Sequence, residues 1–425
     1  MTDEIKTTIK NAPSCMDDYD PDSLDCDIAR QRILDQIKIV NGFEQIALRS
    51  ALGCVLAEDI HSPINVPSHT NSAMDGYAVR GQDLPTGQIK IFKLIGTSLA
   101  GKPWQGKLKQ NECVRIMTGA VMPSETDTVV MQEDVERNDD KIHIGTDQIS
   151  AQNVRQAGED LSIGQLALSK SKALTPSDIG LIASLGIGEV KVFRKLRVAF
   201  FSTGDELKTI GQPLEEGQIY DSNRYTLYGM LKSVGVEIID MGVIKDTRED
   251  TRNAFSTASQ IADVVISSGG VSVGEADFVK EILEELGQLN FWKIAMKPGR
   301  PLTFGKLGDA TFFGLPGNPV SVMVTFYQFV LPAMRKMMGA SETQSVTLKA
   351  RCTSKLHKRP GRTEFQRGIL ETAEDGQLLV HLTGEQGSGI LRSMSLANCF
   401  IILAKESVGT DIDSIVDVQP FFGLI

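Results

Sequence analysis

Histidine and paired cysteine are scarce in this chain of 425 residues. It has five scattered histidines, and none of its six cysteines forms a C-x-x-C pair. Zinc sites and catalytic triads usually draw on histidine or closely spaced cysteine, and disulfide frameworks need regularly spaced cysteines. We therefore expect no zinc site, no histidine triad and no disulfide scaffold, but reduced thiols in a cytosol.

Long apolar runs and an excess of positive charge are also lacking. No segment has the unbroken apolar length of a membrane span, and the first residues lack the basic-then-apolar pattern of a signal peptide. The formal net charge of -10 disfavours general binding to nucleic acid or to anionic membranes. We therefore expect a cytoplasmic protein that binds neither nucleic acid nor membrane, and in which any anion site is a local cluster of Lys, Arg and backbone N–H groups.

The pattern of residues changes several times along the chain. Residues 1–23 are polar and are predicted to form a flexible tail. Residues 24–62 and 159–195 share a helical to mixed pattern, with helices predicted at residues 24–40 and 48–57. We therefore predict that these two segments form one split N-terminal domain.

Three further segments complete the predicted α/β multidomain fold. Residues 63–158 contain short strands and turns, which predicts a β-rich domain inserted into the split domain. Residues 196–340 alternate strand and helix, which is typical of a doubly wound parallel sheet with helices on both faces. Residues 341–425 contain short strands between glycine-bearing turns, which predicts a C-terminal β-barrel domain.

The most distinctive segment is residues 267–278, with the sequence SSGGVSVGEADF. It lies between a predicted buried strand at residues 262–266 and a predicted helix that begins at Asp277. Its glycines let the backbone approach a ligand closely, while Ser272 and Asp277 add a hydroxyl and a carboxylate. Such a turn suits a phosphate or another oxyanion with a hard cation nearby, although an ordinary strand-to-helix connection has the same pattern.

Five other polar loops belong to the same predicted sheet. Because ligands of doubly wound sheets bind beyond the carboxyl ends of the strands, all six loops should meet at one edge. Their carboxylates favour Mg²⁺ over zinc, and their cations favour a phosphorylated or oxyanionic ligand. The carboxylates are Asp205, Glu206, Asp246 and Asp277, and the cations are Lys293, Lys297 and Arg300.

Seven short motifs follow one another along the chain. They are SAMDGYA at residues 72–78, RIMTGA at 115–120, STGDEL at 202–207, YDSN at 220–223, GGVSVG at 269–274 followed by Asp277, MKPGRP at 296–301 and LPGNP at 315–319. In this order they resemble the motifs of the molybdopterin molybdenumtransferases, the MoeA family, which is similar to the E domain of gephyrin. The resemblance extends from about residue 24 to the C-terminus.

This resemblance implies an elongated homodimer of four-domain subunits, in which the partner subunit completes the active site. The implied reaction inserts molybdenum from molybdate into adenylylated molybdopterin, releases AMP and requires Mg²⁺. Molybdopterin adenylyltransferase and molybdoenzyme assembly proteins are the further partners that it suggests.

The resemblance also implies roles for individual residues. Asp75 and Thr118 would face the active site from the inserted domain of the partner subunit. Glu206, Asp246 and Asp277 would line the site from the central domain and hold Mg²⁺. The residues that would shape the last loop or bind substrate are Pro316, Pro319, Ser272, Lys293, Lys297, Arg300, Arg367 and Ser388.

Two other functions fit parts of the sequence. A molybdopterin adenylyltransferase has a similar α/β module and glycine turn, but it lacks the additional domains that carry Asp75 and Thr118. A non-catalytic scaffold like gephyrin relies on a further domain and a long linker, neither of which is seen in this sequence. Without the resemblance, the residues alone indicate a Mg²⁺-dependent enzyme that acts on a phosphorylated ligand.

Overall fold

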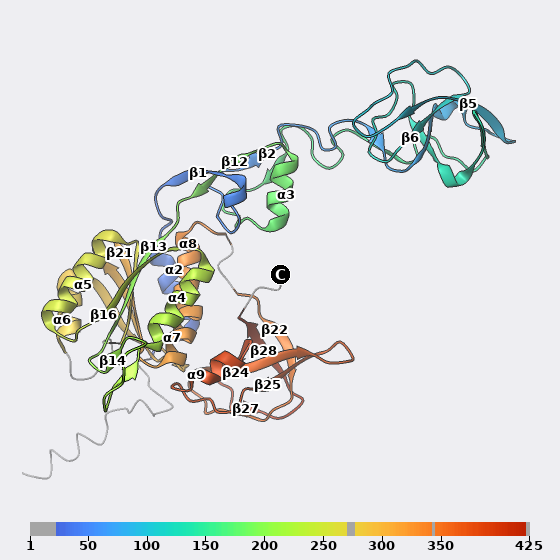
Figure 1. The fold of residues 1–425 in the computed structure, drawn as a ribbon. Coiled ribbons are helices and arrows are strands. Elements are labelled where there is room, and N and C mark those ends of the chain that lie inside the picture. Colours follow the sequence, from blue (N-terminus) through green and yellow to red (C-terminus); the bar gives the residue numbers. More distant parts are fainter. Residues whose placement is uncertain (1–22, 270–276, 342–344, 422–425) are drawn as a thin grey trace, which may run out of the picture.

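The computed structural model describes residues 23–269, 277–341 and 345–421. All but the last residue of the predicted tail, residues 1–23, lie outside the described residues. Figure 1 shows an elongated molecule, with the domain that contains β5 and β6 at one end and the central α/β domain and the C-terminal domain together at the other. In the described part of the chain, no helix is long and apolar enough to cross a membrane.

A six-stranded sheet forms the middle of the central domain. Its first four strands are mutually parallel, and its last two run antiparallel to their neighbours. The strand order is β16 (Glu237–Ile244), β13 (Arg197–Thr203), β17 (Val264–Ser268), β21 (Ala310–Leu315), β20 (Pro301–Leu307) and β18 (Gly287–Lys293). The fully parallel sheet that we expected is therefore wrong at one edge, where a hairpin-like pair of strands replaces a strand–helix–strand crossover.

Helices cover both faces of this sheet because neighbouring residues of each strand point to opposite sides. Phe200 packs with one layer of helices, whereas Phe201 packs with the other. In the second layer, the rings of Phe201 and Phe312 both contact the edge or face of Phe255, at centroid distances of 5.2 and 5.5 Å. The first layer comprises α2 (Cys26–Gln36), α4 (Ser222–Val234), α7 (Pro319–Thr325) and α8 (Leu331–Met337), and the second comprises α5 (Arg248–Ile261) and α6 (Asp277–Leu286).

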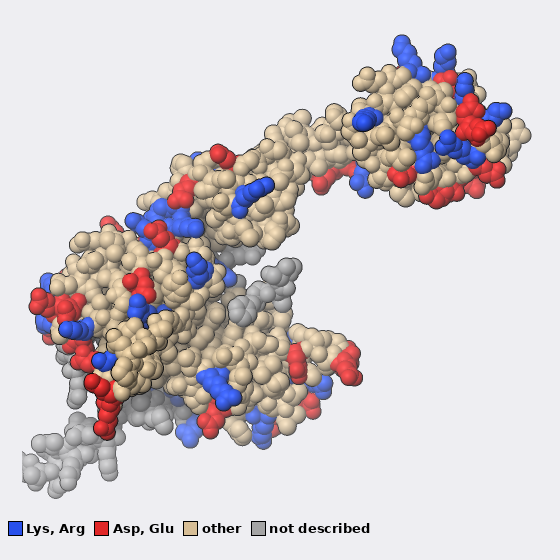
Figure 2. Space-filling model, in the orientation of Figure 1, with Lys and Arg blue, Asp and Glu red and all other residues tan. Residues whose placement is uncertain are grey.

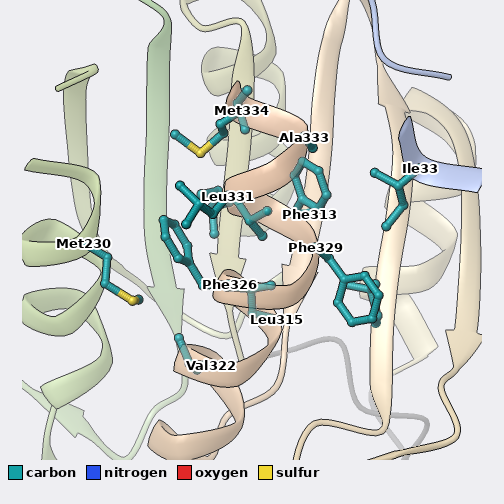
Figure 3. Close-up of a cluster of buried hydrophobic side chains, with 14 of the residues drawn as sticks. Ile33, Met230, Phe313, Leu315, Val322, Phe326, Phe329, Leu331, Ala333 and Met334 are labelled. Carbon is teal, nitrogen blue, oxygen red and sulfur yellow. The ribbon is translucent and has the colours of Figure 1, made fainter. Parts of the chain in front are cut away.

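The helix α2 belongs to the core of the central domain, although the sequence groups its residues with the split domain. Ile33 is fully buried there, and Figure 3 shows it on the side of Phe329, while Phe326 lies on the side of Met230 of α4. The segment from α7 to α8 thus packs between α4 and α2. The predicted domain boundaries themselves stay predictions.

A π-helical turn, Phe326–Val330, joins α7 to α8, and Pro332 is the second residue of α8. Pro332 has no N–H to donate to the carbonyl of Gln328, four residues earlier. Arg30 of α2 supplies the missing donor, because its Nε lies 3.1 Å from that carbonyl oxygen and its guanidinium also contacts the Gln328 amide at 3.0 Å. The Gln328 amide in turn donates to Gln419 of the C-terminal domain at 2.7 Å.

The split domain is held together by strands from its two halves. The pairs are antiparallel, and the core between them includes Leu48, Leu168 and Ile182. The helix that we expected at residues 48–57 is wrong, because only the single 3₁₀ turn Leu48–Ser50 forms there. The elements are β1 (Phe43–Ala47) with β12 (Glu189–Phe193), β2 (Ile60–His61) with β11 (Leu166–Leu168), and α3 (Pro176–Ser184).

Between these halves lies the inserted β-rich domain, as the sequence predicted. A six-stranded sheet forms most of it, and Tyr77, Phe92 and Val130 are buried in its core. Its strands are β7 (Thr128–Met131), β4 (Gly76–Val79), β6 (Glu112–Ile116), β5 (Lys90–Ser98), β9 (Lys141–Ile144) and β8 (Val135–Asn138), with the separate pair β3 (Asn71–Ser72) and β10 (Val154–Arg155).

The C-terminal domain is a closed five-stranded barrel, which confirms the predicted architecture. The order β24–β25–β22–β28–β26 closes because β24 also pairs with β26. The barrel strands are β22 (Leu348–Cys352), β24 (Thr363–Thr372), β25 (Leu378–Leu382), β26 (Cys399–Leu403) and β28 (Ile415–Pro420), and the remaining elements are β23 (Leu356–His357), β27 (Gly409–Thr410) and α9 (Leu391–Leu396).

The contact of Arg30 with Gln328 predicts a stability effect. Arg30→Met should lower the free energy of unfolding by about 1–3 kcal/mol, because it leaves a buried carbonyl without a donor. Arg32→Met is the matched control, since Arg32 is exposed on the same helix. Chemical denaturation of both variants tests this prediction, and equal stability of the two would contradict it.

Candidate active site

The carboxyl edge of the central sheet brings several segments together. The chain goes from β13 to β16 on one side and then returns to β17 on the other, so a switch point lies between β13 and β17. At this point a Cβ on Gly269 would lie 2.7 Å from the carbonyl oxygen of Thr203, so only glycine fits there. The amide of Asn223 at the start of α4 donates to Ser268 Oγ at 2.9 Å and to the Gly317 carbonyl at 2.7 Å. Three segments are thereby fixed to one another at this edge.

Three carboxylates gather at the β16 end of this edge. The backbone N–H of Asp246 donates to Asp205 Oδ1 at 3.3 Å. Burial, and then the negative charges of Asp205 and Glu206, raise the pKa of Asp246. The predicted residues Glu206 and Asp246 are therefore neighbours, and their mutual repulsion favours a cation at this end.

Several buried polar atoms around this edge have no hydrogen-bond partner among the described residues. Such atoms are unusual in folded proteins and are expected to meet a ligand, an ion or water. They include Ser202 Oγ, Thr203 Oγ1, Ser267 Oγ, Asp221 Oδ2, Asn223 Oδ1 and Asp246 Oδ1.

These donors fit Mg²⁺ only in part. Asp246 Oδ1 is a buried, unpartnered carboxylate oxygen, which is the type of ligand that Mg²⁺ prefers. However, no three His, Cys, Asp or Glu side chains converge into a metal site within residues 23–269, 277–341 and 345–421. Mg²⁺ is usually held by one or two carboxylates together with substrate phosphates and water. The site therefore fits a cation that binds together with a phosphorylated ligand.

Two predicted residues of the glycine turn remain untested. Ser272 lies outside the described residues. Asp277 is the first residue of α6, which agrees with the predicted start of that helix, but its side chain is not described. Its helix begins at the same edge that holds Asp246, because α6 follows β17.

Cations occupy the opposite end of the edge. Because β20 is antiparallel to β21, the end of β18 and the start of β20 lie at the carboxyl edge of the parallel strands. The connecting segment contains the short strand β19 (Met296–Lys297), which pairs with β24 of the barrel and sets Lys297 beside Glu364. Lys297 Nζ lies 3.1 Å from Glu364 Oε1. Lys293 ends β18 and is exposed, and Arg300 precedes β20 and is half-buried.

Arg367 is a buried cation on the same strand, β24. Its side chain is 1% exposed, and its Nε donates to Ser393 Oγ at 3.0 Å while a terminal nitrogen donates to the Gly387 carbonyl at 3.0 Å. Burial lowers the pKa of Arg367 to about 10. A buried guanidinium that is hydrogen-bonded only to uncharged oxygens is suited to receive an anion.

The last loop of the sheet connects this cation to the switch point. Pro316 is buried after β21, and Pro319 is the first residue of α7. The carbonyl of Ser388, a residue that the sequence predicted as a ligand, accepts a hydrogen bond from Val320 N at 3.1 Å. The segment that contains Ser388 thus lies against the start of α7, close to the Gly387 carbonyl that Arg367 contacts.

Asp75 and Thr118 form a second cluster in the inserted domain. Asp75 Oδ1 accepts hydrogen bonds from Thr118 N at 2.7 Å and from Thr118 Oγ1 at 2.8 Å. These bonds, the backbone one first, lower the pKa of Asp75, which favours the ionised form of this half-buried side chain at neutral pH. Figure 1 places the inserted domain at the far end of the molecule from β14 (Leu207–Lys208), which marks the edge that holds Asp246. One subunit therefore does not bring its two groups of predicted residues together.

Other surfaces offer weaker candidates. On the face seen in Figure 2, basic and acidic side chains are interspersed, and no continuous basic patch is seen among the described residues. A cavity of about 680 Å³ lies between α2 and the barrel, with Arg30, Gln328 and Lys405 in its lining. None of the predicted site residues lines it, so we place the active site at the sheet edge.

Two residues of this edge were missed in the sequence. Asn223 lies in a motif that we noted, but its role as a link between loops depends on three-dimensional contacts. Glu364 is 5% exposed and pairs with Lys297. The signal that could have identified Glu364 is a run of polar residues, Glu364, Gln366 and Arg367, at alternate or adjacent positions in a strand that is otherwise apolar.

Three family models match consecutive parts of this chain. The MoeA N-terminal region (domain I and II) matches residues 24–186, a probable molybdopterin binding domain matches residues 199–336, and the MoeA C-terminal region (domain IV) matches residues 349–421.

Individual proteins are similar over most of the chain. The molybdopterin molybdenumtransferase of Haemophilus influenzae is 46% identical over 408 residues, which cover 95% of this chain and 100% of the relative. The solved structure of the molybdopterin biosynthesis moeA protein from Pyrococcus horikoshii has a TM-score of 0.82 and 30% identity, and the match covers 94% of this chain and 100% of that one. Gephyrin from Dictyostelium discoideum is 32% identical over 89% of this chain and 60% of the relative.

The fold is that of a multidomain α/β protein whose central sheet gathers polar and charged side chains at its carboxyl edge. The chain belongs to the MoeA family of molybdopterin molybdenumtransferases. It is therefore a transferase of molybdenum cofactor biosynthesis, which confirms the resemblance and the enzymatic function that the sequence indicated.

The raised pKa of Asp246 predicts how the free enzyme responds to pH. The folded state binds this proton more readily than the unfolded state, so the carboxylate destabilises the fold above its folded pKa and ceases to do so as the pH falls through it. Asp246→Asn should therefore raise the Tm of the metal-free protein at neutral pH, and the gain should disappear in acid. Thermal unfolding with a chelator measures this, with exposed Asp147→Asn as the control. A variant of unchanged or lower Tm at neutral pH would refute it.

Proposed function

We propose that this chain inserts molybdenum from molybdate into adenylylated molybdopterin and releases AMP, with Mg²⁺ required. The observation that carries this proposal is the division of one sheet edge into an acidic end, with Asp246, and a cationic end, with Lys297 and Arg367. A phosphoanhydride with its cation suits the first, and an oxyanion suits the second. The switch point between them is where ligands of such sheets bind. The proposed setting is the cytoplasm.

At the acidic end, Asp246 and Asp277, with Glu206, would hold Mg²⁺. The bound cation would stabilise the negative charge that develops on the phosphate oxygens as the anhydride bond breaks. The unpartnered hydroxyls of Ser202 and Thr203 lie at the neighbouring strand end and can donate to phosphate oxygens.

At the cationic end, Lys297, Arg300 and Arg367 would hold the substrate molybdate beside the pterin sulfurs. Arg367 is fixed by two hydrogen bonds, so its guanidinium does not need to be ordered when the anion arrives. The backbone contact between Ser388 and Val320 supports a role of the Ser388 segment in closing this end. Lys293 and Ser272 belong to the same proposed set.

We further propose a homodimer in which Asp75 and Thr118 of one subunit complete the site of the other. The reason is distance, because the inserted domain that carries them lies at the far end of the subunit from β14 and the sheet edge (Figure 1). Exposed large apolar side chains between residues 210 and 228 support this arrangement, since such side chains are common at interfaces. They are Ile210, Leu214, Ile219, Tyr220, Tyr225 and Tyr228. Molybdopterin adenylyltransferase, as the source of the substrate, and molybdoenzyme assembly proteins, as acceptors of the product, are further proposed partners.

A single-turnover incubation with adenylylated molybdopterin, Mg²⁺ and molybdate tests the reaction. We expect molybdate-dependent release of AMP together with formation of molybdenum cofactor, and loss of both in Asp277→Asn with the fold intact. Adenylylation of free molybdopterin by ATP, with the intermediate left intact, would instead assign the chain to the adenylyltransferases. Parental AMP release by Asp277→Asn would refute the role of Asp277.

Mixing two inactive variants tests the shared site. In a twofold symmetric dimer of Asp75→Asn with Asp246→Asn, one site carries both changes and the other carries neither. After random subunit exchange, about a quarter of the sites should be native, so activity should return to about a quarter of the parental value. The double variant, mixed with itself, is the control. No recovery despite proven subunit exchange would place both residues in one subunit's site.

A further inference from the structure

Glu364 is a buried carboxylate inside the cationic end of the edge. It is 5% exposed, and its two oxygens are both engaged. Oε1 pairs with Lys297 Nζ at 3.1 Å, and Oε2 accepts from Gln366 Nε2 at 2.9 Å. The Gln366 amide is fixed in turn by the carbonyl of His357 at 3.1 Å. The carboxylate is therefore held in one place, on the strand that also carries Arg367.

The charges that face Glu364 come from several segments and are mostly positive. Lys297 approaches from β19, and Arg367 lies on the same strand and is close enough for Glu364 to act on its pKa. Lys358 is 8% exposed and lies in the field of Glu364, Glu406, Arg362 and Lys297. Its Nζ donates to the carbonyls of Arg359, Lys405 and Ser407 at 3.1, 3.1 and 2.9 Å.

Lys297 is positioned to exchange partners. Its side chain is 50% exposed, in contrast to the 7% of the Glu364 side chain. An ammonium group has three donors, and Glu364 takes one of them on the buried side. An oxyanion that arrives from the open side would meet the same ammonium group, which still has donors to offer.

We propose that Glu364 is an internal counter-ion that competes with the incoming oxyanion for Lys297 and thereby limits the affinity of the site. This inference rests on the proposed binding of molybdate at the cationic end. A fixed negative charge a few ångströms from the anion opposes its binding, and at a partly buried site such a charge changes affinity by about tenfold or more. Glu364 would thus keep Lys297 paired before substrate arrives and pair with it again once the molybdate has been consumed. Its role is that of a positioning residue, since it acts through Lys297.

The test compares Glu364→Gln with Glu406→Gln in the full-length protein. Glu364→Gln keeps the shape of the side chain and removes its charge. Glu406 is the matched control because it is exposed and also lies in the field of Lys358, but has no contact with Lys297. Equilibrium binding of molybdate should tighten about tenfold in Glu364→Gln and change less than about twofold in Glu406→Gln.

Steady-state kinetics separates this role from a purely structural one. Glu364→Gln should lower KM for molybdate without raising kcat, whereas a loosened fold would raise KM and lower Tm. In a Lys297→Gln background, the effect of Glu364→Gln should shrink, because the partner for which Glu364 competes is gone. If Glu364→Gln fails to fold, Glu364→Asp serves instead, since its shorter side chain withdraws the charge from Lys297. It should tighten molybdate binding by a smaller factor.

The outcomes distinguish this inference from the proposed function. Molybdate binding by the parent, with equal or weaker binding by the folded Glu364 variant, would overturn the counter-ion role and leave the oxyanion site standing. No binding of molybdate by the parent would overturn the oxyanion site, and with it the competition. If Glu364→Gln tightens molybdate binding by the same factor with Lys297 present and in the Lys297→Gln background, Glu364 does not compete for Lys297.

Discussion

The pairing of β19 with β24 is the contact on which the cationic end depends. It consists of two residue pairs, Met296 with Thr363 and Lys297 with Glu364, and it joins the connection between β18 and β20 to the first long strand of the barrel. Through it, Arg367 and the segment around Ser388 reach an edge that belongs to another domain. Without this short parallel contact, the central sheet would keep its acidic end and the cations of its own connection, but Arg367 and the Ser388 segment would no longer be held against it. The site is thus a property of two domains, even within one subunit.

Electrostatic strain at the acidic end is consistent with a site that is completed by its ligand. Asp205, Glu206 and Asp246 repel one another, and several buried polar atoms nearby have no partner among the described residues. A fold selected only for stability would pair or expose such groups. A bound cation would offset the repulsion among the carboxylates, and phosphate oxygens would accept hydrogen bonds from the unpartnered hydroxyls. In a metal site that is already complete without substrate, these groups would be paired before the ligand binds. A cation site that is completed by its ligand explains why the acidic carboxylates lie together while the described residues alone do not form a complete metal site.

Much of the central domain could be predicted from the sequence, and the reasons are physical. Alternating strand and helix patterns identify a doubly wound sheet, and the rule for its carboxyl edge places Glu206, Asp246 and the Pro316 loop together before any coordinates are known. The antiparallel direction of β18 and β20 was not predicted, because the apolar residues of such strands look like those of parallel strands. The helix at residues 48–57 was predicted wrongly because the apolar residues of this segment have helical spacing, although most of the segment packs as irregular chain. Glu364 was missed because its role depends on a contact between domains that no local pattern records.

The separation of Asp75 from Asp246 argues for assembly as the last step in building the site. Asp75 is kept ionised mainly by two hydrogen bonds from Thr118, and the positive charge of Arg115 contributes less. Thr118 fixes the orientation of this carboxylate, and the inserted domain that carries it lies at one end of an elongated subunit. Asp75 is therefore suited to contact a ligand that is bound outside its own domain. The elongated subunit can deliver it to the sheet edge of a second copy but not to its own. Shape, charge and distance therefore support the proposed site shared between subunits, in which dimerisation would be the step that brings the two halves together.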